Sequence, residues 1–191
     1  MPPSPAFRSS AALSFPLLGR RVLLRPFETA DVPAAHAVYG DEEVMRYVGS
    51  GGAVPPEETA RMIAAYRRHQ HEHGYACWAV VDRASGELIG DAGLEVTAHG
   101  VELGYTLARA AWGRGLASEA ARLCVGAAFG PLELPRLAAL ADVENPASAR
   151  VLAKLGFLRQ GREAAFGRPH HVFELTPDRF ATSGATPSTA P

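Results

Sequence analysis

The chain has 191 residues, 47 % of them hydrophobic and 20 % charged, which suffices for one domain with a sizeable core. Its formal net charge of −1 gives no electrostatic reason to expect a nucleic-acid partner. No apolar run approaches the roughly 20 residues that a membrane-spanning helix needs, so a membrane partner is not expected either.

Both chain ends lack a regular pattern. Residues 1–19 are rich in Pro, Ser and Ala and lack a basic start before an apolar block, so we expect a loose leader and not a signal peptide. Residues 181–191 are rich in Pro, Ser, Thr and Ala, and we expect a disordered tail. A single domain is therefore expected over residues 20–180.

The first half of this domain predicts a strand, two helices and a meander. A strand is expected over 21–25, and helices are expected over 29–39 and from about 56 to 74. Three strands follow, with short turns between them, at 76–82, 87–96 and 101–107. Strands so closely spaced are typical of an antiparallel meander.

The second half alternates helices and strands. The expected elements are a helix over 116–129, a strand over 136–143, a helix from Asn145 to Gly156, a strand from Phe157 and a last strand over 171–176. Asn145 can cap its helix, Pro146 suits the first helical position, and Gly156 ends the helix. Two groups of helices around a central sheet indicate an α/β fold with a mixed sheet.

The two cysteines, Cys77 and Cys124, fall in a strand-like run and on the apolar side of a helix-like run. We interpret them as buried thiols of a cytoplasmic protein and not as a disulfide. Neither has a neighbouring signature of a nucleophile, so covalent catalysis by cysteine is not expected.

The strand over 101–107 leads into a glycine-containing junction, Trp112-Gly113-Arg114-Gly115-Leu116-Ala117-Ser118-Glu119-Ala120. The first N–H groups of a helix lack intrahelical partners and attract anions, and glycine lets a ligand approach the backbone. A P-loop is excluded because Leu116 and Ala117 stand where that motif has Lys and then Ser or Thr. A dinucleotide-binding fingerprint is excluded because its third glycine is replaced by Ser118. The junction predicts a pyrophosphate site; the alternative is that the glycines only cap a strand–helix turn.

These segments together resemble the GNAT superfamily of acetyl-CoA-dependent N-acetyltransferases, over about residues 20–176. The motifs that carry the resemblance are Glu102-Leu103-Gly104-Tyr105, the glycine-containing junction, Asn145 with Ser148, Lys154-Leu155-Gly156-Phe157, and Val22-Leu23-Leu24-Arg25-Pro26 with Asp31. Within the superfamily they resemble the branch that acetylates ribosomal-protein N-termini. The resemblance implies a GNAT-like, largely antiparallel sheet of about 6–7 strands with helices on both faces.

Acetyl-CoA is the co-substrate that the resemblance implies. The strand over 103–107 would pair with its pantetheine arm, and the helix start would hold its pyrophosphate. The implied cofactor-binding residues are Leu103, Tyr105, Thr106, Leu107, Arg109, Arg114, Gly115, Leu116, Ala117, Ser118 and Asn145.

Transfer of an acetyl group to an amine requires an uncharged attacking nitrogen, and Glu102 is the leading general base. Asp91 and Glu95 are weaker rivals, and the alternative for Glu102 is an exposed strand glutamate. Many relatives donate a proton to the leaving thiolate from a tyrosine, but Leu152 stands at that position here. The resemblance suggests Ser148 as its substitute.

Alternatives to Ser148 as the acid stay open. Ser148 can simply bond its own helix backbone, and Tyr105 is another possible acid. A dedicated acid is not required, because the coenzyme A thiol has a pKa close to that of cysteine.

The implied function is transfer of acetyl to a primary amine, of a protein N-terminus or a small molecule, by direct attack in a ternary complex. The enzyme would be a monomer or homodimer, and residues 40–56 would form a mobile loop over the acceptor site, with the acids Asp41, Glu42 and Glu43. The missing tyrosine keeps an alternative from another class open, a non-catalytic acyl-CoA-binding module or sensor. Transfer of a longer acyl group is a third possibility.

Histidines give no metal site. Only His69 and His73 share a helix face, and no third ligand is evident, so no metal is expected. We expect His170 and His171 to be exposed; the alternative is that they border the substrate pocket.

Overall fold

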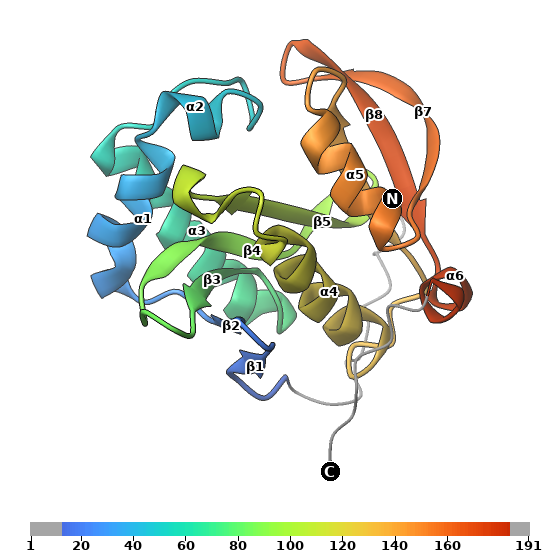
Figure 1. Ribbon diagram of the computed structural model, residues 1–191, viewed down its shortest axis with the longest axis horizontal. Coiled ribbons are helices and arrows are strands. Elements are labelled where there is room, and N and C mark those ends of the chain that lie inside the picture. The colour runs from blue at the N-terminus through green and yellow to red at the C-terminus, as the bar shows by residue number, and fades with distance from the viewer. Residues whose placement is uncertain (1–12, 184–191) are drawn as a thin grey trace.

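An eight-stranded sheet in the order β1-β2-β3-β4-β5-β6-β8-β7 forms the centre of the protein (Figure 1). The computed structural model describes residues 13–183. The strands are β1 (Leu17–Leu18), β2 (Val22–Arg25), β3 (Cys77–Asp82), β4 (Leu88–Thr97), β5 (Gly100–Leu107), β6 (Leu137–Asp142), β7 (Leu158–Ala165) and β8 (Arg168–Leu175). Neighbouring strands are antiparallel except β5 and β6, which are parallel.

The helices are α1 (Val32–Tyr39), α2 (Glu42–Met45), α3 (Pro56–His73), α4 (Leu116–Phe129), α5 (Pro146–Lys154) and α6 (Pro177–Thr182). Short 3-10 turns at Thr29–Asp31 and Arg109–Ala111 precede α1 and the junction before α4. No helix in this part of the chain has both the length and the apolar character needed to cross a membrane.

The expected α/β fold with a mixed, largely antiparallel sheet is confirmed. The sheet has one strand more than the expected 6–7. This strand is β1, which lies within the segment expected to be a loose leader and pairs with β2. Helix α6 is a further addition, because the pattern over 177–182 is too short to indicate a helix. Residues 1–12 and 184–191, which make up most of the expected leader and tail, lie outside the described residues.

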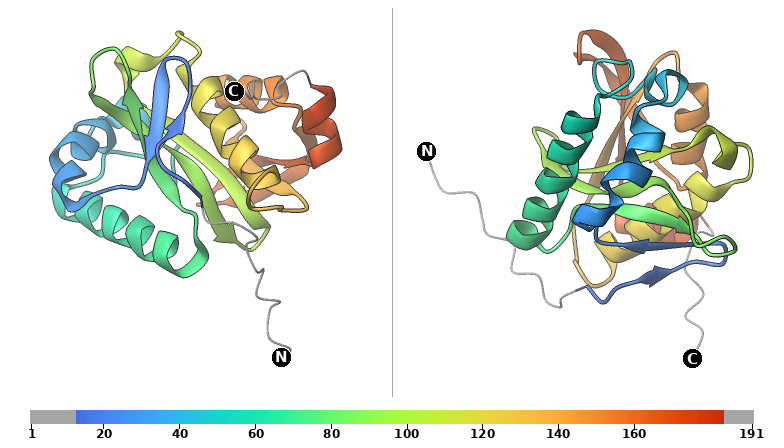
Figure 2. Two further views of the ribbon diagram at one scale, coloured as in Figure 1. Left: turned by 90° about the horizontal axis from the view of Figure 1, so that it is seen from below. Right: turned by 90° about the vertical axis from the view of Figure 1, so that its left-hand side faces the viewer.

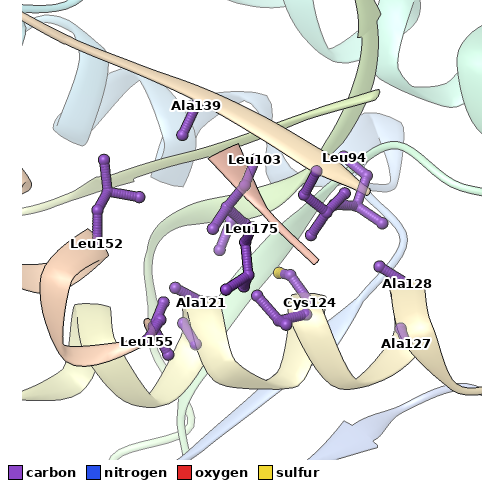
Figure 3. Close-up of a cluster of buried hydrophobic side chains, with 14 of the residues drawn as sticks. Leu94, Leu103, Ala121, Cys124, Ala127, Ala128, Ala139, Leu152, Leu155 and Leu175 are labelled. Atoms are coloured by element: carbon purple, nitrogen blue, oxygen red, sulfur yellow. The ribbon is translucent and has the colours of Figure 1, made fainter. Parts of the chain in front are cut away.

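Two apolar clusters cover the two faces of the sheet. Leu94 and Leu103 are cross-strand partners that pack with Cys124 of α4, and Leu155 and Leu175 complete this region of the larger cluster (Figure 3). The smaller cluster joins α1 and α3 to the other face, through residues that include Phe27, Tyr39, Ile63 and Ala79. The two helix groups are visible on opposite sides of the sheet in Figure 2.

Strand alternation explains why β4 presents apolar side chains to one face of the sheet and carboxylates to the other. Successive side chains of a strand point to opposite faces, so Ala92 and Leu94 of β4 face α4, while Asp91 and Glu95 face the side of α1 and α3. The sheet therefore places carboxylates on the face opposite its larger apolar core.

The parallel pair β5–β6 is the irregular point of the sheet. A single register pair, Glu102↔Ala138, joins the two strands, whereas β4 and β5 are paired over eight positions from Gly90↔Leu107 to Thr97↔Gly100. Residues 103–107 consequently have a strand partner on only one side. An unpaired strand edge offers main-chain N–H and C=O groups to a ligand.

Candidate active site

A cavity of about 770 Å³ lies where β5 and β6 separate. It is bordered by the α2 segment, β4, β5, the start of α4, the end of β6, α5 and the β7–β8 hairpin. The predicted site residues that line it are Glu102, Leu103, Tyr105, Thr106, Leu107, Gly115, Leu116, Ala117, Ser118, Asn145 and Ser148. Segments far apart in sequence thus meet around one space.

The N-terminus of α4 opens onto this cavity. Gly115 is its N-cap residue with φ +77°, a left-handed conformation that glycine adopts without strain. Among the described residues, no protein acceptor bonds the main-chain N–H groups of 116–118, whereas the N–H of Glu119 bonds the carbonyl of Gly115 at 3.2 Å. Three free N–H groups at the start of a 14-residue helix are suited to binding an anion, and the pyrophosphate site stays a prediction.

An ion pair holds this junction against β2. Arg21 donates its main-chain N–H to Glu119 Oε1 at 2.7 Å and its Nε to Glu119 Oε2 at 2.8 Å. The Nη1 of the same arginine donates to the carbonyl of Arg114 at 2.6 Å. The turn that leads into Gly115 is therefore fixed from outside the cavity.

Arg109 and Arg114, two predicted cofactor-binding residues, do not line the cavity. Arg109 Nε donates to Asp41 Oδ2 at 2.8 Å, and Arg114 Nη2 donates to Asp82 Oδ2 at 3.2 Å. Contact of either guanidinium with a cofactor stays a prediction.

Three carboxylates lie on one face of the β4–β5 pair. Glu95 is the cross-strand partner of Glu102, and Asp91 lies opposite Thr106. All three acids line the cavity. Burial raises the pKa of Glu102, an effect that contacts with the Thr97 hydroxyl and His99 partly oppose.

Asp91 is the most buried of these acids, at 4 % exposure. The hydroxyl of Tyr39 donates to its Oδ1 at 2.9 Å. Burial is the main cause that raises the pKa of Asp91 to about 7, although the Tyr39 bond acts in the opposite direction. A carboxyl with a pKa near neutrality is suited to exchanging a proton or meeting a cation.

Hydroxyl groups meet on the other side of β5. Tyr105 donates its hydroxyl proton to the carbonyl of Ser148 at 3.0 Å, and Ser148 Oγ lies 3.0 Å from Tyr105 Oη. With the tyrosine proton so placed, the serine hydroxyl is the donor in the second contact. Burial raises the pKa of Tyr105 well above its ordinary value.

Helix α5 begins as the sequence predicts. Asn145 is its N-cap, with Oδ1 accepting the Ser148 N–H at 3.1 Å, and Pro146 occupies the first turn. Leu152, at the position of the tyrosine found in many relatives, is buried and lines the cavity.

The segment expected to be a mobile loop over the acceptor site contains helix α2. Asp41 caps that helix by accepting the main-chain N–H of Glu43 at 2.9 Å, while Glu43, Tyr47 and Gly49 line the cavity. Figure 1 shows α2 and the β7–β8 hairpin at the same end of the molecule. Arg168 of the hairpin joins them, donating from Nη1 to the carbonyl of Arg46 at 2.6 Å.

The expectation that His170 is exposed is wrong. This residue is 3 % exposed and lines the cavity, and its Nδ1 lies 3.0 Å from the Arg168 carbonyl. Its burial follows from the register of β8 on β6, in which it lies opposite Asp142. His171, the next residue, is half-buried.

His69 and His73 stack with ring centroids 4.3 Å apart. His69 accepts the Val96 N–H at Nε2 and bonds the Tyr75 carbonyl through Nδ1, so both of its ring nitrogens hold the fold together. Within residues 13–183, no three His, Cys, Asp or Glu side chains are placed to share a metal ion.

Both cysteines are free and buried, as predicted. Burial raises the pKa of the Cys77 and Cys124 thiols well above the ordinary value, which disfavours the reactive thiolate.

Tyr39, Tyr47 and Phe166 are site residues that sequence reasoning missed. Helical periodicity places Tyr39 on the apolar side of α1, but its bond to Asp91 spans 52 residues and leaves no local signal. Tyr47 and Phe166 line the cavity from connecting segments, where no periodic pattern marks a cavity-lining residue.

Comparisons with known proteins agree with this geometry. Residues 21–158 match the family described as acetyltransferase (GNAT) domain. The uncharacterized N-acetyltransferase YoaA of Bacillus subtilis (strain 168) is 32 % identical over 151 residues, which cover 77 % of this chain and 85 % of YoaA. Spermidine N(1)-acetyltransferase of Escherichia coli (strain K12) is 30 % identical over 149 residues, covering 73 % of this chain and 74 % of that enzyme.

A solved structure of Mycobacterium smegmatis RimJ in complex with CoA-disulfide has a similar fold. It superposes with a TM-score of 0.72 at 22 % sequence identity and covers 86 % of each chain.

Proposed function

The chain belongs to the GNAT acetyltransferase family and is an N-acetyltransferase, and we propose that it transfers acetyl from acetyl-CoA directly to a cationic primary amine. The observation that supports this proposal is the single cavity that connects the free N–H groups of α4 with the carboxylates of β4 and β5. Donor and acceptor can then meet in one ternary complex, without a covalent enzyme intermediate. The proposed domain comprises residues 20–180.

The chain's own groups fit acetyl-CoA, which supplies an activated acetyl thioester. Main-chain N–H groups of 116–118 would bind the pyrophosphate, and the free edge of residues 103–107 would bind the pantetheine arm. The space beside Gly104 is open, because a Cβ built at that position meets no atom within 4 Å. The pantetheine arm can therefore approach the backbone there. Asn145 would approach the arm from α5, and Arg109 and Arg114 would add charge if they left their present carboxylate partners.

Glu102 would remove the proton from the acceptor nitrogen. Its raised pKa makes it a better proton acceptor than an ordinary glutamate, and it lies on the face that carries the other cavity acids. Asp91 and Glu95 remain the rivals.

Ser148 would hold a proton for the leaving sulfur. Ser148 lines the cavity, and its Oγ lies 3.0 Å from the Tyr105 hydroxyl, which burial keeps protonated. This pair would supply from α5 and β5 the acid that Leu152 does not supply.

Charge favours a cationic acceptor. Glu43, Asp91, Glu95 and Glu102 line the cavity on the side of α2, β4 and β5 and have no ion pair among the described residues. The basic residues that line it, Arg150 and Lys154, belong to α5 and not to these strands. Such carboxylates attract an ammonium group and can take its proton. The sequence motifs resemble the ribosomal N-terminal branch, while a relative acts on spermidine, so a small polyamine and a protein N-terminus are both within the proposal.

A kinetic comparison of two glutamate variants tests the roles. We expect Glu102→Gln to lower kcat at least about 100-fold, the usual size of a general-base effect, with little change in acetyl-CoA affinity. Glu87→Gln, at an exposed position before β4, is the matched control and should behave as wild type. Equal rates for Glu102→Gln and wild type would remove Glu102 from the mechanism; tight acetyl-CoA binding with no transfer by wild type would favour the binding-module alternative.

A further inference from the structure

Buried aspartates in this protein fall into two kinds. Of the four in the described residues, three form an ion pair with arginine: Asp31 with Arg25 at 2.7 Å, Asp82 with Arg114 at 3.2 Å and Asp142 with Arg168 at 3.0 Å. The fourth, Asp91, has no cationic partner. A buried carboxylate without a counterion destabilises the folded state, so a role in binding would explain why Asp91 stands at this position.

Within residues 13–183, the groups that act on Asp91 carry no positive charge. Tyr39 comes from α1, Tyr66 from α3, Cys77 from β3, Thr106 from β5, and the nearby charged group on its own strand is the acid Glu95. All five line the cavity or bond Asp91 directly. The side that is open is the cavity itself, so a ligand in the cavity can bring the missing cation.

Asp91 is distant from the proposed base along the sheet. Its cross-strand partner is Thr106, four residues beyond Glu102, and Glu95 is the partner of Glu102. Four residues of strand span about 13 Å. A single ammonium group cannot contact carboxylates so far apart, but the two ends of one linear molecule can.

We infer that Asp91 binds a second ammonium group of the acceptor and thereby selects linear diamines or polyamines over monoamines. The inference rests on the proposed function: the reacting nitrogen lies by Glu102 and the other end lies by Asp91. Asp91 is then a specificity-determining residue, and its bond from Tyr39 orients the carboxylate without neutralising it. An ammonium at this position would also favour the ionised form of Asp91, which burial disfavours.

The test compares 1,8-diaminooctane with 8-aminooctan-1-ol, which has a similar length and one cationic nitrogen. With wild-type protein and acetyl-CoA, we expect KM for the diamine to be at least about tenfold lower, the size expected for one charge-assisted bond. Asp91→Asn keeps a hydrogen-bond acceptor for Tyr39 and should remove this difference in KM by raising KM for the diamine. 1,2-Diaminoethane, too short to bridge the two acids, should gain nothing from Asp91.

Two results would overturn the inference. Equal KM values for diamine and amino alcohol with wild type would show that no second cation is recognised, and this comparison does not depend on the variant folding. A loss of kcat on both substrates in Asp91→Asn would make Asp91 a base and not a specificity residue.

Calorimetric titration of both amines, without acetyl-CoA, separates this inference from the proposed function. Tighter binding of the diamine to wild type than to Asp91→Asn would support the role of Asp91 even if no amine were acetylated. Equal binding would count against it even if acetyl transfer were observed.

Discussion

Replacement of Asp91 by Asn should change the pH dependence of stability with a predictable sign. The pKa of Asp91 rises from 3.8 to about 7 on folding, mainly through burial. An acid with a raised pKa binds its proton more tightly in the folded state than in the unfolded state. The folded state is therefore unaffected below about pH 4, is destabilised progressively between pH 4 and 7, and carries the full penalty above pH 7.

A rise of about 3 pKa units, at about 1.4 kcal/mol for each, corresponds to about 4 kcal/mol. Asn cannot ionise, so Asp91→Asn should gain about this much stability relative to wild type between pH 4 and pH 8. Any constant effect of the amide on packing contributes equally at each pH and cancels from that change.

Urea unfolding of wild type and variant at pH 4, 5, 6, 7 and 8 measures the difference in the free energy of unfolding. Asp31→Asn is the opposite control: Arg25 holds the pKa of Asp31 below its ordinary value, so the ionised wild-type residue stabilises the fold at neutral pH, and its loss should destabilise the variant there. A stability difference for Asp91→Asn that stays constant from pH 4 to pH 8 would refute the reasoning.

Further predictions concern the two halves of the cavity. Gly115→Ala should weaken acetyl-CoA binding at least about tenfold by isothermal titration. The control is Gly86→Ala, with a similar φ of +74°, which should bear only the backbone strain of about 1–2 kcal/mol. A Cβ meets nothing within 4 Å at Gly86 and only Arg21 Nη2, at 3.5 Å, at Gly115, so neither change crowds its neighbours. Equal acetyl-CoA affinities of the two variants would place the pyrophosphate elsewhere. Ser148→Ala should lower kcat about 100-fold and leave KM for acetyl-CoA unchanged, and Tyr105→Phe should lower kcat less. An unchanged kcat in Ser148→Ala would mean that the thiolate leaves without a proton from Ser148. The acid limb of the pH profile of kcat/KM should lie above the ordinary range of glutamate, because burial raises the pKa of Glu102, and Glu102→Gln should lose that limb. A limb that persists in Glu102→Gln would point to Asp91 as the titrating base.

Local signals in the sequence were enough to place the ends of the site's elements. The glycine that starts α4, and the Asn145-Pro146 start and Gly156 end of α5, act within one helical turn, so their residue types predict the structure there. The apolar side of α4 was likewise predicted from the sequence, and Cys124, which was placed on it, is buried.

Contacts between distant segments were beyond sequence reasoning. The bond between Tyr39 and Asp91 and the pair Tyr105–Ser148 join residues 52 and 43 positions apart, and the burial of His170 depends on the register of β8 against β6. The separation of β5 from β6, which share one paired position, is likewise marked by no residue pattern within either strand.

Acetyl transfer itself is the measurement that tests the proposed function most directly. The pure protein would be incubated with acetyl-CoA carrying a ¹³C-labelled acetyl group and a pool of polyamines, diamines, amino acids, aminoglycosides and N-terminal peptides, and the products would be identified by mass spectrometry. We predict a labelled N-acetyl product, formed by wild type and strongly reduced in Glu102→Gln, with diamines or polyamines favoured in the pool. Absence of any labelled amine, while acetyl-CoA remains bound and intact, would contradict the proposal.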